Sequence, residues 1–279
     1  MSRKVVHKLR GRPTSDGAGV RMTRVIGTPA LDHFDPFLLL DEFRSDDPND
    51  YIAGFPDHPH RGFETVTYML AGRMKHGDNQ GNTGLLGPGS VQWMTAGRGI
   101  VHSEMPQQVD GLMWGFQLWV NLPASDKMTA PRYQDIQGED IPEVSLGNGV
   151  EAKVIAGELG GVAGAVSHVA TDPIYYDLHF EAGAELTVPL PEGHNAFLYV
   201  YDGQVAAGPE DAASRVDRGE IALLSHGDSI ALAAGNGPCR LILVAGRPLN
   251  EPIARYGPFV MNTAAEIQQA FIDYQSGRL

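Results

Sequence analysis

The sequence has only one cysteine, Cys239, among 279 residues. A single cysteine excludes a disulfide within the chain and leaves no set of thiolates that could hold a metal. The sequence also lacks an apolar run long enough to cross a bilayer, and its charged start lacks the apolar segment of a signal peptide. We therefore expect a protein of a reducing, cytoplasmic compartment, with no membrane partner.

Basic residues are scarce as well. Lys and Arg number 21 against 34 Asp and Glu, which gives a formal net charge of -13. So acidic a surface disfavours phosphate backbones, and we expect no direct contact with nucleic acid. The hydrophobic fraction of 42% is that of a globular protein, and the length suits one large domain or two of ordinary size.

Helix-like patterns are also rare, whereas 34 Gly and 19 Pro favour a turn-rich all-β fold. Short strand-like runs recur between glycine-containing turns, as expected for a sandwich or barrel. Examples are residues 65–70, 90–94, 115–120, 196–201 and 241–244. One helix is predicted near the end, where Thr263 to Glu266 form a capping box and Gly277 ends an apolar stripe.

The two halves of the chain resemble each other. Residues 62–72 align with residues 193–203, each a strand bounded by glycine with a tyrosine in register. We therefore predict two β-barrels of similar topology: an N-terminal barrel over 1–135, and a C-terminal barrel over 150–279 that includes the final helix. The break between them is expected in the polar stretch 130–149. In this register Pro189 and Pro191 correspond to His58 and His60, so we expect one metal, in the first barrel.

Two short motifs carry the chemistry. His58 and His60 form one pair, and His102 and Glu104 form another. Residues two apart on a strand point the same way, so each pair can direct both side chains at one point. Three imidazoles and a carboxylate suit iron, manganese, nickel or copper, and leave positions open for a substrate. The alternative, that these are ordinary core or surface residues, does not explain two pairs of matched parity.

A second carboxylate, Glu64, competes with Glu104, because it shares strand parity with His58 and His60. We favour Glu104 as ligand, with Glu64 orienting an imidazole, and leave open which carboxylate acts as a base. We interpret His76 as a solvated turn residue. Residues that either line a pocket or pack in a core are Phe55, Trp93, Phe116, Gln117 and Trp119.

The blocks around these motifs resemble the signature blocks of pirins, members of the cupin superfamily. They are residues 58–68, 91–104 and 117–122, with further matches at 35–43 and 257–263. The resemblance implies an all-β bicupin of two jelly-roll β-barrels with a terminal helix. It also implies one iron in the N-terminal barrel, held by His58, His60, His102 and Glu104. It also implies an enzyme that uses dioxygen to open flavonols such as quercetin, with release of carbon monoxide and with Glu104 or Glu64 as base.

Two other functions stay open at this point. Pirins also include iron-dependent regulators, so a redox-responsive protein that binds a protein partner is the alternative to the dioxygenase. Cupin folds further support small-acid isomerases and binding modules, which fold alone does not exclude.

Overall fold

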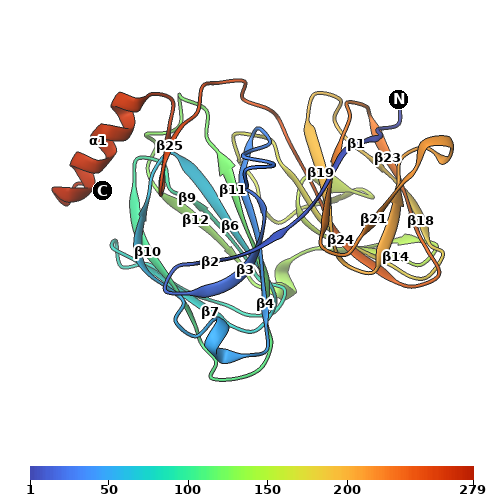
Figure 1. The fold of residues 1–279 in the computed structure, drawn as a ribbon, viewed down its shortest axis with the longest axis horizontal. Coiled ribbons are helices and arrows are strands. Elements are labelled where there is room, and N and C mark those ends of the chain that lie inside the picture. The colour runs from blue at the N-terminus through green and yellow to red at the C-terminus, as the bar shows by residue number, and fades with distance from the viewer. The chain divides into compact units, whose positions relative to one another are not determined.

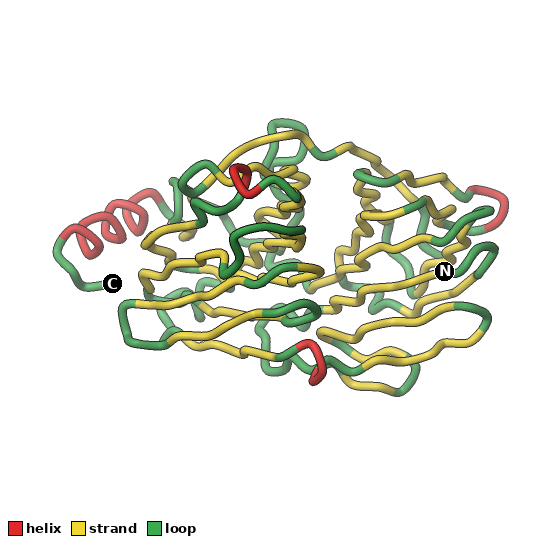
Figure 2. Tube along the Cα trace, turned by 90° about the horizontal axis from the view of Figure 1, so that it is seen from below, coloured by secondary structure: helices red, strands yellow, loops and turns green.

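The computed structural model describes all residues from 1 to 279 and consists mainly of antiparallel strands joined by short turns (Figure 2). It divides into two compact units. We call Arg12–Glu139 with Leu249–Leu279 the histidine unit, and Met1–Gly11 with Asp140–Pro248 the aliphatic unit. The change between units at residues 139 and 140 falls inside the polar stretch where the sequence suggests a break.

The histidine unit holds two sheets, a hairpin and the single α-helix. Its elements are β2 Arg12–Asp16, β3 Val20–Ile26, β4 Phe37–Ser45, β5 Phe55–His60, β6 Phe63–Ala71, β7 Met74–Asp78, β8 Thr83–Leu86, β9 Val91–Thr95, β10 Ile100–Pro106, β11 Met113–Asn121, β12 Arg132–Ile136, β25 Ala254–Tyr256, β26 Phe259–Met261 and α1 Ala264–Gln275. One sheet has the order β12-β9-β6-β11-β4-β3-β2, and the other has the order β5-β10-β7-β8.

The aliphatic unit repeats this plan. Its elements are β1 Val5–Arg10, β13 Glu143–Gly147, β14 Val150–Ala156, β15 Glu158–Leu159, β16 Val162–Ala163, β17 Ile174–Phe180, β18 Glu185–Pro189, β19 Asn195–Asp202, β20 Gln204–Ala207, β21 Ser214–Asp217, β22 Glu220–Leu224, β23 Ser229–Ala234 and β24 Cys239–Gly246. The larger sheet has the order β1-β22-β19-β24-β17-β14-β13, and the smaller has the order β18-β23-β20-β21.

The shared topology confirms the internal repeat. The order β9-β6-β11-β4-β3 in one unit matches β22-β19-β24-β17-β14 in the other, which gives β6 and β19 equivalent places. Likewise β5 and β10 are neighbours in one small sheet, as β18 and β23 are in the other. The predicted all-β fold of two barrels is therefore confirmed.

The two ends of the chain lie outside the barrels in which the prediction placed them. Residues 1–11 belong to the aliphatic unit, and residues 249–279 belong to the histidine unit. The blue strand β1 pairs with β22 of the aliphatic unit, with Val5 opposite Leu224 (Figure 1). At the other end, the red helix α1 packs on the hairpin β25-β26 of the histidine unit. Strand pairing between residues more than two hundred apart leaves no local signal in the sequence, which explains why the boundaries differ.

The helix itself is as predicted. The Thr263 hydroxyl accepts a hydrogen bond from the Glu266 amide, and the Glu266 carboxylate accepts one from the Thr263 amide, which completes the capping box. Phe271 on α1 lies with its ring 5.0 Å from that of Phe259 on β26. No helix of the structure is long and apolar enough to cross a membrane.

Candidate metal centre

Strands β5 and β10 bring three histidines together. His58 lies opposite His102 across the antiparallel pair, and His60 ends β5. One ring nitrogen from each of the three lies within 4.8 Å of the others. His60 is 3% exposed and His102 is 0% exposed, so the group sits inside the unit rather than on its surface. The parity argument therefore places these three side chains correctly.

The protonation state of the buried imidazoles suits a metal. Burial lowers the pKa of His60 and of His102 well below its usual value, and the neighbouring histidines lower it further. Both rings are therefore neutral at pH 7 and keep a lone pair. Neither nitrogen of His102 has a hydrogen-bond partner. A fully buried imidazole with both nitrogens unpaired is costly unless something else binds it, and a metal ion meets that need.

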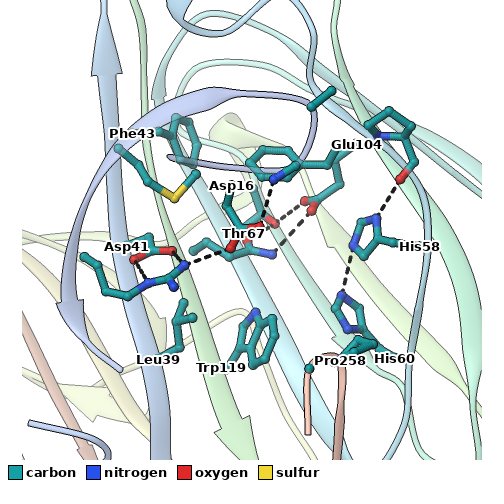
Figure 3. Close-up of a pocket in the computed structure, with 18 of the residues that line it drawn as sticks. Asp16, Leu39, Asp41, Phe43, His58, His60, Thr67, Glu104, Trp119 and Pro258 are labelled. Atoms are coloured by element: carbon teal, nitrogen blue, oxygen red, sulfur yellow. Dashed lines mark hydrogen bonds and ion pairs between the residues drawn. The ribbon is translucent and has the colours of Figure 1, made fainter. Parts of the chain in front are cut away.

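The geometry of His58 and His60 fits the same ligand. Nδ1 of His58 lies 2.8 Å from the Pro56 carbonyl oxygen, which can only accept, so Nδ1 carries the proton and Nε2 stays free. The two Nε2 atoms of His58 and His60 face each other at 3.0 Å (Figure 3). Two nitrogens bound at about 2.1 Å and at right angles would lie about 3 Å apart, so this spacing is that of neighbouring ligands.

Glu104 lies beside the histidines but outside the group of three. Its carboxylate turns toward Thr67, as Figure 3 shows, and accepts a hydrogen bond of 2.8 Å from the Thr67 hydroxyl. The Gln117 side-chain amide donates to its second oxygen at 3.4 Å. All three residues line the cavity, so the two polar side chains hold the carboxylate at the cavity wall. Its assignment as a fourth metal ligand stays a prediction.

Glu64 does not lie where the parity argument suggests. Arg61 and Gly62 interrupt the chain between β5 and β6, and Gly62 has a φ of 88°, so the alternation of faces restarts after the turn. Glu64 is buried away from the cavity and accepts a hydrogen bond of 2.6 Å from the Thr95 hydroxyl. Burial raises its pKa, and the Thr95 bond opposes that shift. The role of orienting an imidazole is thus not supported.

The turn after His60 is fixed by groups that the sequence did not single out. The buried ammonium of Lys127 donates to the Gly62 carbonyl at 2.8 Å and to the Val260 carbonyl at 3.1 Å. Burial lowers the pKa of Lys127 to about 8. Arg61 forms an ion pair of 2.9 Å with Asp273 on α1. The C-terminal segment therefore holds the turn that positions His60.

A cavity of about 610 Å³ opens beside the histidines. Its apolar walls include Met22, Leu39, Phe43, Phe55, Met74 and Trp119, and its polar lining includes His58, His60, Thr67, Glu104 and Gln117. Three of the five predicted lining residues, Phe55, Gln117 and Trp119, do line it. The other two, Trp93 and Phe116, are fully buried elsewhere and pack in the core, which was the alternative considered for each.

The interpretation of His76 as a solvated turn residue is wrong. His76 lies on β7 opposite Glu104 on β10 and is 1% exposed. Its Nε2 is 3.2 Å from a carboxylate oxygen of Asp135. Gly84 makes room for the ring, since a Cβ there would collide with His76. The signal that was missed is the alternation Met74, Lys75, His76, which places His76 on the same face as apolar Met74.

Comparison with known families agrees with this architecture. The family model described as "Pirin" matches residues 19–120, and the model described as "Pirin C-terminal cupin domain" matches residues 175–279. Together these segments cover most of both units and include all three histidines.

Individual relatives cover almost the whole chain. A Pseudomonas aeruginosa protein named "Putative quercetin 2,3-dioxygenase" is 53% identical over 99% of this chain and 98% of its own length. Human pirin is 45% identical over 99% of this chain and 94% of its own. Among solved structures, a quercetin 2,3-dioxygenase from Acinetobacter baumannii has a TM-score of 0.91 at 35% identity, covering 100% of this chain and 98% of that one.

Proposed function

The chain belongs to the pirin family of cupin proteins, and on that premise we propose that it is a metal-dependent dioxygenase that opens flavonols such as quercetin. The observation that carries the proposal is the group of three histidines, two of them buried, beside a cavity that a carboxylate also lines. The names of the relatives from Pseudomonas and Acinetobacter support the same reaction.

We assign the metal to His58, His60 and His102, with Glu104 as the fourth ligand and the proton acceptor. When bound, a divalent transition metal, which we propose to be iron, supplies Lewis acidity and redox chemistry. One flavonol and one dioxygen would be consumed. The two ring carbon–carbon bonds of the carbon that bears the 3-hydroxyl would break, that carbon would leave as carbon monoxide, and both oxygen atoms of the dioxygen would enter the ring-opened ester.

The hydrogen bonds around Glu104 support its role as base. The Thr67 hydroxyl has a single proton but lies near two acceptors, Glu104 Oε1 at 2.8 Å and Gln117 Oε1 at 2.6 Å. If Glu104 takes the proton of a flavonol 3-hydroxyl, it can donate to Thr67, Thr67 can donate to Gln117, and Gln117 can donate back to Glu104. Each of these three hydrogen bonds then joins a donor to an acceptor, so the protonated form of Glu104 is accommodated.

The remaining walls orient the substrate and exclude water. The cavity volume lies within the usual range for small-molecule sites, which is about 300–1,000 Å³. Trp119 lies with its ring centroid 5.2 Å from that of His60, so a planar ligand on Trp119 has its edge at the histidine group. Phe43 and Leu39 continue the apolar wall. Such a wall favours a flat aromatic ligand over a sugar or peptide.

The test is turnover of quercetin by protein loaded with iron under anaerobic conditions and then exposed to air. We expect loss of flavonol absorbance with one carbon monoxide released per quercetin, and neither in the His60→Ala variant. Thr67→Val should lower kcat while leaving bound metal unchanged, and Thr67→Ser should restore it, because only the hydroxyl is needed.

Absence of turnover by protein with stoichiometric bound iron would contradict the dioxygenase. It would leave the metal centre in place and favour the alternative, a redox-responsive protein that binds a protein partner.

A further inference from the structure

Arg255 stands at the rim of the same cavity, on β25. Its guanidinium lies over the Trp119 ring, 5.0 Å from the ring centre, and Trp119 in turn meets His60. A ligand that lies beside Trp119 with one end at the histidine group therefore has Arg255 near its other end. Gly257 and Pro258, which also line the cavity, form the turn that follows β25 and bring this arginine to the rim.

The donors of Arg255 are largely unused. Its guanidinium makes one hydrogen bond, from Nη1 to the Leu38 carbonyl at 3.1 Å, and no carboxylate lies within ion-pair distance. A guanidinium carries five N–H donors arranged to grip a carboxylate with two parallel bonds. Arg255 thus presents a charged fork with spare donors at the edge of a ligand cavity.

The other arginine of the cavity shows the contrast. Arg24 binds both oxygens of Asp41, at 2.9 and 2.7 Å, and also binds Asp16 at 2.9 Å. Asp41 and Asp16, two of the acidic residues that line the cavity, therefore neutralise the charge of Arg24. Arg255 is the cation available for a ligand.

From this arrangement we propose that Arg255 selects the substrate by binding an anionic group, so that the preferred ligands are hydroxylated aromatic acids. The hydroxyl end would lie at the histidine group, the ring on Trp119, and the carboxylate on Arg255. This inference rests on the proposed function for the orientation of the hydroxyl end. It extends that function by naming a class of substrate.

The environment of Arg255 leaves it accessible to an anion. Arg255 is exposed on β25, so a ligand at the rim can reach it. Partial burial of the side chain and then the charge of Arg24 lower its pKa, whereas the charges of Asp32, Asp41 and Asp16 raise it, and an arginine stays charged at any pH relevant to the protein.

The experiment measures binding, independently of turnover. Metal-loaded protein is titrated without oxygen, by calorimetry, with 3,4-dihydroxybenzoate, 3,4-dihydroxyphenylacetate and 3-(3,4-dihydroxyphenyl)propionate, each beside its methyl ester. The three lengths allow for the span from the histidine group to Arg255, and each ester has the same ring without the charge. The variants are Arg255→Gln, Arg255→Lys and Arg73→Gln, the last an exposed arginine outside the cavity.

We expect at least one acid to bind about tenfold or more tightly than its ester. Arg255→Gln should bring that ratio close to one while changing the Kd of the ester by less than about twofold. Arg255→Lys should keep part of the preference, since it keeps the charge but loses the fork. Arg73→Gln, which changes the net charge equally, should behave as the natural protein does.

The inference is overturned if no acid binds more tightly than its ester, or if the preference survives Arg255→Gln. Either result can occur in a protein that still opens quercetin. In that case the proposed dioxygenase activity is retained and the proposed substrate class is rejected. Conversely, a preference that depends on Arg255 in a protein that does not turn quercetin over would keep the ligand class and remove the flavonol reaction.

Discussion

The two units differ most where their small sheets match. In the histidine unit, His58 on β5 lies opposite His102 on β10. In the aliphatic unit, Val188 on β18 lies opposite Ile230 on β23, and both are fully buried. The same pair of strands therefore holds either a polar group open to a ligand or a closed hydrocarbon core. The comparison shows that the barrel does not determine the chemistry, which depends on a few inward-facing residues.

The surroundings of these pairs differ in the same sense. Val188 and Ile230 belong to one continuous core of 26 buried residues, nearly all of them hydrocarbon. In the histidine unit, small apolar clusters lie together with buried polar side chains such as His102 and Glu104. A cavity that must admit a ligand cannot also be filled, so this unit gives up apolar packing for a site.

The largest expected effect follows from removing one ligand. His60→Ala should lower metal affinity by at least about 100-fold, because it removes one of the four proposed ligands while the strands hold the other three in positions set for a four-ligand site. Metal content after dialysis, measured by mass spectrometry, checks this. The matched control is His194→Ala, which removes the buried histidine of the aliphatic unit and should leave the metal content unchanged. Stoichiometric metal in His60→Ala would contradict the assignment of the metal centre to His58, His60 and His102.

The next effect separates the two buried carboxylates. Glu104→Gln should keep some metal yet lower kcat for quercetin by about 100-fold or more, because the amide cannot accept the proton. Glu64→Gln, whose carboxylate lies away from the cavity, should change kcat little. The comparison is read from single-turnover rates at equal metal content. Equal losses in both variants would mean that the position of Glu64 off the cavity does not exclude it from catalysis.

A third variant tests whether the aliphatic unit tolerates what the histidine unit carries. Val188→His should lower the free energy of unfolding by about 2 to 4 kcal/mol, since it buries an imidazole with no partner in a hydrocarbon core. Chemical denaturation measures the loss, with the volume-conserving Val188→Thr as a milder polar control. An unchanged stability would show that this unit, too, has room for a polar group.

The sequence predicted the parts of this fold that depend on local pattern. Strand alternation, the capping box at Thr263 and the repeat around residues 62–72 and 193–203 each involve residues close in sequence or copied between halves. The two pairs of candidate ligands, His58 with His60 and His102 with Glu104, were located for the same reason, since each pair lies on one strand. The resemblance to pirins added the identity of the family, which spacing alone could not give.

What could not be predicted depends on pairing across long distances. The exchange of the chain ends between units rests on β1 meeting β22, more than two hundred residues away. The position of Glu64 was misjudged because a positive φ at Gly62 is invisible to a parity count. The proposed roles of Thr67, Gln117 and Arg255 could not be predicted, because these residues come together only where β6, β11 and β25 line one cavity.

The smallest effect concerns the stability of the metal-free protein. The pKa of His102 in the folded state is lowered, chiefly by burial, from the ordinary value of about 6.5 that the unfolded chain retains. As pH falls below about 6.5, the unfolded chain therefore binds protons that the folded chain does not. The free energy of unfolding then falls by at most about 1.4 kcal/mol per pH unit for each such histidine.

His102→Leu should remove the contribution of His102 to this pH dependence. At pH 7 it should also stabilise the metal-free protein by about 1 to 3 kcal/mol, because two unpaired buried nitrogens disappear. Denaturation at a series of pH values measures both, with Ile230→Leu as the control on the matching strand. A gain in stability from losing a ligand, against no gain from the aliphatic control, would mean that His102 is kept for binding and not for folding, whereas a loss would place His102 among the residues that the folded core needs.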